Sequence, residues 1–406
     1  MRQLISCSRL FFTLIYKKGL LGAMQVTQID RQASDYVYSK AAERDSTFEL
    51  LRIISMLSIT FFHFATHGEF DFNTQVLSVS RLWCYFIASG NVGVDVFVLI
   101  SGYFLVKFNF EAFNIKRILK FWGQVFFYSV FIYILLVITG ICEFSFKSLA
   151  KAALPIIFDQ WWFASTYFVL YLFHPFINIF LNKLDKKTFQ SLLVLLIIIC
   201  CIIPSFTFTS FQSNSLLWFI TLYCVAGYIR LFGLNPTFKL RHHLFFCLLF
   251  SALRYLSSVI TLVIGTRIPS AVRFSLAVYG IPYVLTFLSA LSLFMLFTCI
   301  KMGYHKWINV IASASFGVYL IHDSKIVRPL LWETIFKNAS YQDTALIIPY
   351  SIGVVCLVYT VCTLIDLLRQ RTIEKMFLSF VNKKADSLIK PFEAIIAFCK
   401  KMVFGK

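Results

Sequence analysis

Charged residues are scarce in this chain. Asp, Glu, Lys and Arg make up 14% of its 406 residues, whereas 59% are hydrophobic. Typical soluble proteins carry about 25% charged residues, so this composition excludes an ordinary soluble domain. Acidic residues are the rarest, because 19 of them stand against 38 Lys and Arg and leave a net charge of +19. In a soluble protein that excess would suggest nucleic acid, but no basic patch here accompanies a nucleic-acid-binding motif. We expect no nucleic-acid partner.

Metal-binding patterns are missing as well. The 11 cysteines are scattered through apolar segments, and Cys200 and Cys201 are adjacent rather than spaced as C-x-x-C. Such cysteines are typical of buried, inert thiols. We therefore predict no metal site. The sequence also shows neither an internal repeat nor a segment with the composition of a separate soluble domain.

Long apolar runs fill most of the sequence. Because a crossing needs about 20 apolar residues, these runs predict an all-α polytopic membrane protein with about ten transmembrane helices. The predicted helices cover about residues 48–67, 82–105, 117–140, 162–182, 189–206, 214–232, 243–264, 274–300, 307–322 and 344–366.

These helices divide the chain into three regions. We expect a basic cytoplasmic segment over 1–47, a transmembrane domain over 48–366 and a basic amphipathic cytoplasmic tail over 367–406. Lys and Arg concentrate in alternate loops, and cytoplasmic loops of membrane proteins carry an excess of these residues. With an even number of crossings, this bias places both termini in the cytoplasm.

Two ionisable residues in the first predicted helix indicate a site. Arg52 and His63 are 11 positions apart, which is close to three helical turns, so they share a face and lie about 16 Å apart along the axis. Ionisable groups inside a membrane helix usually face a polar interior, and histidine can take a proton from a hydroxyl. The alternatives are an Arg52 that reaches the inner interface and an interfacial His63 bonded to a carbonyl.

Further polar residues recur inside the predicted helices. Asp95 lies in the middle of the second helix and requires a partner; it is either a catalytic group or a structural clamp. Arg117 and Lys120 begin the third helix one turn apart, where they would hold a phosphorylated ligand or anchor the helix at the inner face. Trp162 begins the fourth helix at the outer interface, and His322 ends the ninth at the depth of His63.

Together these segments resemble the membrane acyltransferase-3 family, whose members O-acetylate bacterial surface glycans and related acceptors. Arg52 and His63 match the arginine, ten residues and histidine of the family's first helix. Residues 93–105 are similar to its second-helix signature, and 162–175 to its tryptophan-led fourth helix. Arg117 and Lys120 are similar to a basic pair, with lysine where arginine is common. Residues 315–322 resemble a terminal Tyr-Leu-Ile-His segment.

The resemblance implies acetyl-CoA as the acyl donor and a glycan or glycolipid acceptor. It also implies a multi-pass protein of the bacterial cytoplasmic (inner) membrane, associated with polysaccharide synthesis machinery. Three groups of site residues follow from it. They are Arg52, His63 and Asp95 for catalysis, Arg117 and Lys120 for the donor, and Ser101, Tyr103, Trp162 and His322 for substrate.

The chain departs from the family pattern in two places. Many relatives carry a glutamate shortly after the fourth-helix tryptophan, whereas Ala164, Ser165, Thr166 and Tyr167 stand here. Any role of that glutamate is missing or supplied elsewhere. The extracellular esterase-like domain of some relatives does not follow the last helix, so we expect this chain to complete the transfer itself or to hand on to a separate protein.

Two other functions suit parts of the pattern. Ten helices with buried charges are compatible with a transporter or exporter of a polysaccharide or small organic acid, although inverted repeats and paired broken helices are not seen. A non-catalytic partner of a polysaccharide synthase is the second alternative.

Overall fold

The structure is a computed structural model that describes residues 45–72, 77–107, 115–233 and 237–383. Nearly all of the predicted N-terminal segment and the end of the predicted tail lie outside these residues. Over the described part the chain is helical and forms no strand. Eight helices there are long and apolar enough to cross a membrane, which confirms an all-α polytopic membrane protein.

Each of these eight crossings corresponds to one predicted run, and three contain a local irregularity. The crossings are α3 (Ser46–Thr66); α4 (Val79–Ala88) continued by Ser89–Asn91 and α5 (Val92–Leu105); α6 (Ile115–Ile138); α8 (Trp162–Leu181); α9 (Lys186–Ile197) continued by Ile198–Ile202 and α10 (Ile203–Thr207); α11 (Ser215–Phe232); α12 (Leu240–Gly265); and α17 (Ile347–Arg369). The last helix runs on through Gln370–Glu374 to Lys383.

The other two predicted crossings are broken. The run at 274–300 forms α13 (Phe274–Ala277) and α14 (Val284–Thr298), and Gly280 and Pro282 stand between them, where they interrupt a helix. The run at 307–322 forms α15 (Lys306–Ser313) and α16 (Ser315–His322). These short helices explain why the sequence predicts ten crossings and the described residues contain eight long ones.

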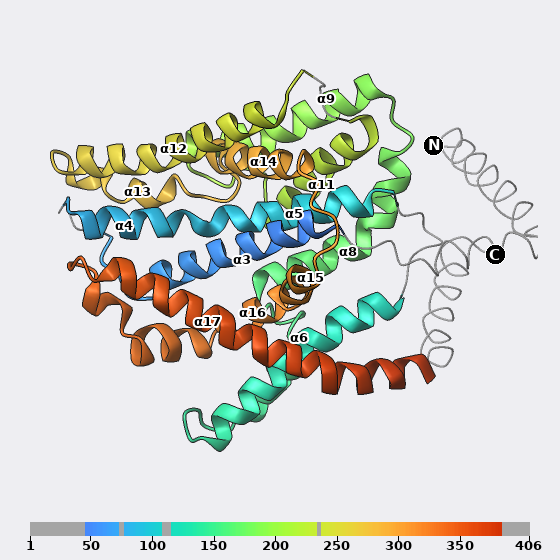
Figure 1. The fold of residues 1–406 in the computed structure, drawn as a ribbon, viewed down its shortest axis with the longest axis vertical. Helices are drawn as coiled ribbons and strands as arrows, with labels where there is room; N and C mark the ends of the chain where they lie inside the picture. Colours follow the sequence, from blue (N-terminus) through green and yellow to red (C-terminus); the bar gives the residue numbers. More distant parts are fainter. Residues whose placement is uncertain (1–44, 73–76, 108–114, 234–236, 384–406) are drawn as a thin grey trace, which may run out of the picture.

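Small residues let the central helices approach closely. In Figure 1, α3, α4 and α5 run through the middle of the molecule, with α12, α13 and α14 along one side and α6 and α17 on the other. A Cβ added at Gly102 of α5 would lie 2.9 Å from the Tyr223 Cα of α11. Such contacts hold membrane helices together by packing.

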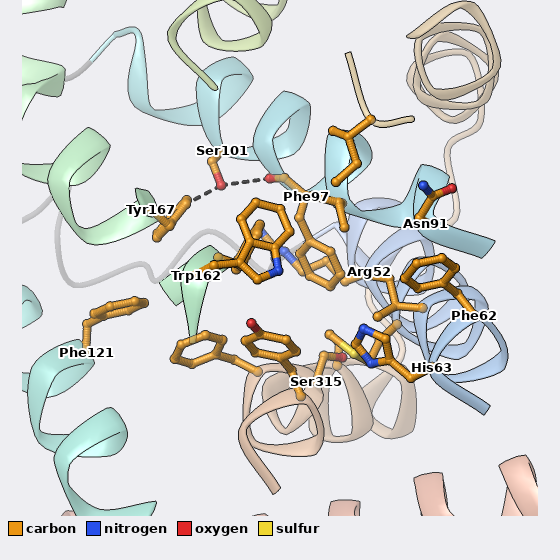
Figure 2. A pocket seen from close by; sticks show the side chains of 18 of the residues that line it. Arg52, Phe62, His63, Asn91, Phe97, Ser101, Phe121, Trp162, Tyr167 and Ser315 are labelled. Atoms are coloured by element: carbon orange, nitrogen blue, oxygen red, sulfur yellow. Dashed lines mark hydrogen bonds between the residues drawn. The ribbon is translucent and has the colours of Figure 1, made fainter. Parts of the chain in front are cut away.

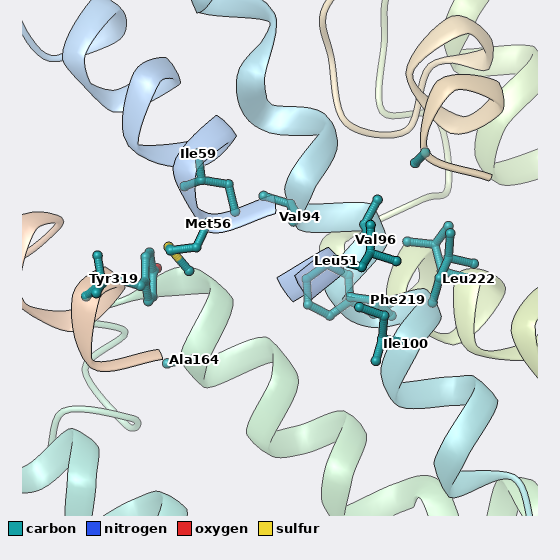
Figure 3. Close-up of a cluster of buried hydrophobic side chains, with 14 of the residues drawn as sticks. Leu51, Met56, Ile59, Val94, Val96, Ile100, Ala164, Phe219, Leu222 and Tyr319 are labelled. Atoms are coloured by element: carbon teal, nitrogen blue, oxygen red, sulfur yellow. The ribbon is translucent and has the colours of Figure 1, made fainter. Parts of the chain in front are cut away.

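The core lies where α3, α5, α8 and α11 meet. Its members Leu51, Val96, Ile100, Phe219 and Leu222 have no exposed surface, and Figure 3 shows them between these helices. Because α5 is enclosed by α3, α11 and α14, it is buried on several faces. It therefore holds rigidly any side chain that it presents to a cavity.

Candidate active site

A cavity of about 310 Å³ lies beside the core. This volume is at the lower end of the roughly 300–1,000 Å³ of small-molecule sites. Six residues of α3 line it, most of them at helical intervals. They are Glu49, Arg52, Met56, Ile59, Phe62 and His63. Residues of α5, α6, α8, α15 and α16, with Asn91 and Ile281, complete the wall. Figure 2 shows His63, Ser101, Trp162 and Ser315 around the same space.

The hydrogen bonds of His63 fix the position of its ring proton. His322 Nδ1 lies 2.6 Å from the Val318 carbonyl oxygen, which can only accept, so this nitrogen carries the proton of a neutral His322. His322 Nε2 is then an acceptor, and His63 Nδ1 donates to it at 2.9 Å. A neutral His63 consequently keeps the lone pair on Nε2, the nitrogen suited to take a proton.

Asp323 supplies negative charge behind the two histidines. Its Oδ1 lies 3.4 Å from His63 Nδ1 and 3.4 Å from His67 Nε2, and Arg328 donates to both carboxylate oxygens at 2.7 and 2.8 Å. Burial alone would raise the pKa of the Asp323 carboxyl, but attraction to His63 and hydrogen bonds from His67 and Arg328 hold that pKa below its ordinary range. The carboxylate is therefore ionised at neutral pH, where it favours a positive charge on His63.

The same cluster offers donors for a metal ion. His63, His67 and Asp323 each present one ligand atom, and the three atoms lie within 4.8 Å of one another. Arg328 already binds both oxygens of Asp323, and His63 Nδ1 faces His322. A metal would displace these contacts, so we assign none here, and the absence of a metal stays a prediction.

Arg52 has an acidic partner in the cavity wall. Glu49, one turn earlier on α3, forms an ion pair with it, and both residues line the cavity. The sequence alone does not single out Glu49, because an acidic residue in the first turn of a helix is common. Its three-residue spacing from Arg52 is the signal that would have found the pair.

Hydroxyl groups line another part of the wall. Tyr167 of α8 donates to Ser101 Oγ at 3.0 Å, and Ser101 donates to the Phe97 carbonyl at 2.9 Å. Figure 2 shows these two hydrogen bonds above Trp162. Ser101 and Trp162 thus lie in the cavity with Arg52 and His63.

Other predicted site residues lie outside this wall. Asp95 is fully buried on α5, where it accepts a hydrogen bond from Trp218 Nε1 of α11 at 2.9 Å. That contact fits the structural clamp rather than a group within the cavity. Tyr103 accepts a hydrogen bond from Arg230 at 3.1 Å at the far end of α5. His322 does not line the cavity, but it accepts a hydrogen bond from His63, which does.

The predicted donor-binding pair lies close to the cavity without lining it. Lys120 forms an ion pair with Glu374 at 2.5 Å, and Arg117 contacts the Tyr171 hydroxyl. Phe121, the next residue on α6, does line the cavity. The basic first turn of α6 is therefore a neighbour of the site.

Comparison with known proteins gives one finding. A family model described as an acyltransferase domain, that of the acyltransferase-3 family, matches residues 45–367. No curated protein and no solved structure matches the chain.

Proposed function

The chain belongs to the acyltransferase-3 family, and we propose that this membrane acyltransferase moves an acetyl group from acetyl-CoA to a hydroxyl of a cell-surface polysaccharide or of its lipid-linked precursor. The position of His63 supports the proposal most directly. Its ring lines the cavity, and its contact with His322 leaves the lone pair on Nε2. An imidazole in this state is suited to take a proton from a hydroxyl.

The proposed transfer balances with His63 as the only proton carrier. The acceptor oxygen forms a bond to the thioester carbonyl carbon while its proton moves to His63 Nε2. Asp323, 3.4 Å from Nδ1, stabilises the imidazolium that forms. The carbon–sulfur bond then breaks, its electron pair leaves with sulfur, and His63 returns the proton to give the free thiol of CoA.

Positive charge near the cavity suits the phosphates of the donor. Arg52 is in the wall, and Arg117 and Lys120 begin the helix that contributes Phe121. Cations bind phosphate oxygens through charge-assisted hydrogen bonds. All three cations also have partners in the protein, because Lys120 pairs with Glu374, Arg52 with Glu49, and Arg117 with the Tyr171 hydroxyl; we assign donor binding to the three together.

The apolar part of the wall favours transfer over hydrolysis. Met56, Ile59, Phe97, Phe163 and Phe316 surround the polar groups, and such a lining excludes water from a reactive thioester. In this proposal the protein works in the cytoplasmic membrane of a bacterium, beside the machinery that builds its polysaccharide acceptor.

The test measures O-acetyl esters in the glycans of cells that lack the native gene. Expression of the wild-type chain should restore these esters, whereas His63→Ala should lower transfer by about 10²–10⁴-fold, the usual contribution of a general base. His243→Ala is the matched control, since His243 is also buried but lies outside the cavity wall. Wild-type esters in the His63→Ala strain, at equal protein level, would contradict the proposal.

A further inference from the structure

The hydroxyl of Tyr319 is a buried polar group in the cavity wall. Tyr319 belongs to α16 and is 5% exposed. Its hydroxyl lies near the Phe163 backbone, but no hydrogen bond of normal geometry satisfies it. A buried hydroxyl without a partner is costly, and most such groups in native proteins are paired. Because Tyr319 lines the cavity, a bound substrate can supply the partner that this hydroxyl lacks.

The position of Tyr319 relates it to His63. The two rings are 6.5 Å apart, centroid to centroid, and both line the cavity from different helices. Phe163 packs edge-on against Tyr319 at 5.9 Å, which limits the motion of the ring. The Tyr319 ring is thus held beside the proposed base.

The proposed reaction requires a donor other than His63. When the acceptor oxygen attacks, the π electrons of the thioester carbonyl move onto its oxygen, and this negative charge must be stabilised. His63 is occupied with the proton of the acceptor. Arg52 is paired with Glu49, and the Tyr167 hydroxyl already donates to Ser101. Tyr319 has no such prior partner.

We infer that the Tyr319 hydroxyl donates a hydrogen bond to the thioester carbonyl oxygen as it becomes an oxyanion, which makes Tyr319 a catalytic residue of the acyl transfer. The inference rests on the proposed function. Tyr319 neither gains nor loses a proton; its bond strengthens as the charge forms and weakens when the carbon–sulfur bond breaks. A donor of this kind accelerates the reaction without needing a charge of its own.

The test is Tyr319→Phe, which removes only the hydroxyl. Membranes from the deletion strain that carry each variant receive labelled acetyl-CoA, and the rate of label entering the endogenous glycan gives kcat and the KM for the donor. We expect kcat to fall by about 10²–10³-fold, as for loss of one oxyanion donor, with KM within about twofold of wild type, because the donor acts mainly in the transition state. Thermal stability should stay equal or rise, because no protein hydrogen bond is lost.

Tyr279→Phe is the matched control. Tyr279 is 3% exposed and its hydroxyl also lacks a hydrogen bond of normal geometry, but it does not line the cavity. Its loss should leave kcat at the wild-type value. An unchanged kcat in Tyr319→Phe, a rise in KM alone, or a lower kcat that follows a lower melting temperature would each overturn the inference. A wild-type chain that transfers no label would overturn the proposed function, and the inference with it.

Discussion

At the scale of single residues, the state of His63 depends on His322. The imidazole of His322 accepts from His63 Nδ1 and donates to the Val318 carbonyl, so it acts on the reaction through the orientation and tautomer of His63. His322 is therefore a positioning residue in the proposed mechanism. This arrangement resembles the general design in which a base is oriented by a third group.

Substitution of His322 tests that role. His322→Leu removes both hydrogen bonds and should lower kcat by at least about tenfold, part of the 10²–10⁴ that a general base supplies. His322→Gln retains an amide oxygen for His63 and an amide N–H for Val318, and should recover much of the loss. The label-transfer assay measures both variants, with melting temperatures as the folding control. Equal activity of the leucine and glutamine variants would contradict the positioning role.

Helical periodicity explains which site residues could be predicted from the sequence. Arg52 and His63 share a face of one helix, and the structure places both in one cavity. Asp95 shows the limit of this reasoning. Because α5 packs against α3, α11 and α14, a polar residue on it has protein on several sides. Its polarity predicts a partner, which proves to be Trp218, but not the direction of that partner.

Long-range partners were beyond the sequence for a similar reason. His63 and His322 are 259 positions apart, and only the tertiary structure brings Asp323 and Arg328 behind them. The missing fourth-helix glutamate is a related case. The cavity still contains one carboxylate in its wall, that of Glu49, and it comes from α3 rather than α8.

At the scale of elements, the site depends on how closely α5 approaches its neighbours. Gly102 lies against the backbone of Tyr223, where a Cβ would approach the Tyr223 oxygen to 2.9 Å. The helix α5 also presents Phe97 and Ser101 to the cavity. A side chain at Gly102 would therefore move α5 away from α11 and disturb the cavity wall.

Gly102→Val should destabilise the protein by about 1–3 kcal/mol, the usual cost of overpacking a core. The measurement is the thermal unfolding midpoint of the purified protein in detergent. Gly353→Val is the control on α17, since a Cβ at Gly353 meets nothing within 4 Å. The two variants introduce the same side chain into a helix. Equal melting temperatures for them would contradict the close packing of α5 on α11.

Element boundaries were predictable where a single apolar run forms a single helix. The runs at 274–300 and 307–322 look continuous in hydropathy, yet each forms two helices. Gly280 and Pro282 mark the first break. Nothing comparable in the sequence marks the break at Ala314, which lies between the cavity-wall residues Ser313 and Ser315.

At the scale of the whole molecule, hydrogen bonds connect loops with neighbouring helix ends at each of the two ends of the helix bundle. At one end, Ser46 N–H donates to the Gly303 carbonyl at 2.9 Å, and Asn182 donates to the Val106 carbonyl at 3.1 Å. At the other, Asn338 donates to the Phe64 carbonyl at 2.9 Å. At the first of these ends, the rings of Phe48 and Tyr103 stack with their centroids 5.5 Å apart, so the start of α3 lies beside the end of α5. The loop that carries Lys183, Lys186 and Lys187 therefore lies at the opposite end of the molecule from His63.

This grouping leads to a prediction about orientation in the membrane. Cytoplasmic loops carry the excess of Lys and Arg, so the end with Lys183, Lys186 and Lys187 should be cytoplasmic and the end with Ser340 outside. Single cysteines at Lys187 and at Ser340, both exposed, can be placed in a chain whose 11 native cysteines are replaced. An impermeant thiol reagent then reports their side.

Ser340→Cys should label in intact cells, and Lys187→Cys only after permeabilisation. The cysteine-free parent gives the background, and retained glycan acetylation shows that it is folded. The reverse pattern would contradict the orientation and move His63 and His322 to the cytoplasmic side. The acceptor hydroxyl would then have to reach the base from the cytoplasm, which favours a lipid-linked precursor over a finished surface polysaccharide. Labelling of Ser340→Cys from outside is compatible with both acceptors of the proposed function, whereas labelling only after permeabilisation argues against the finished surface polysaccharide.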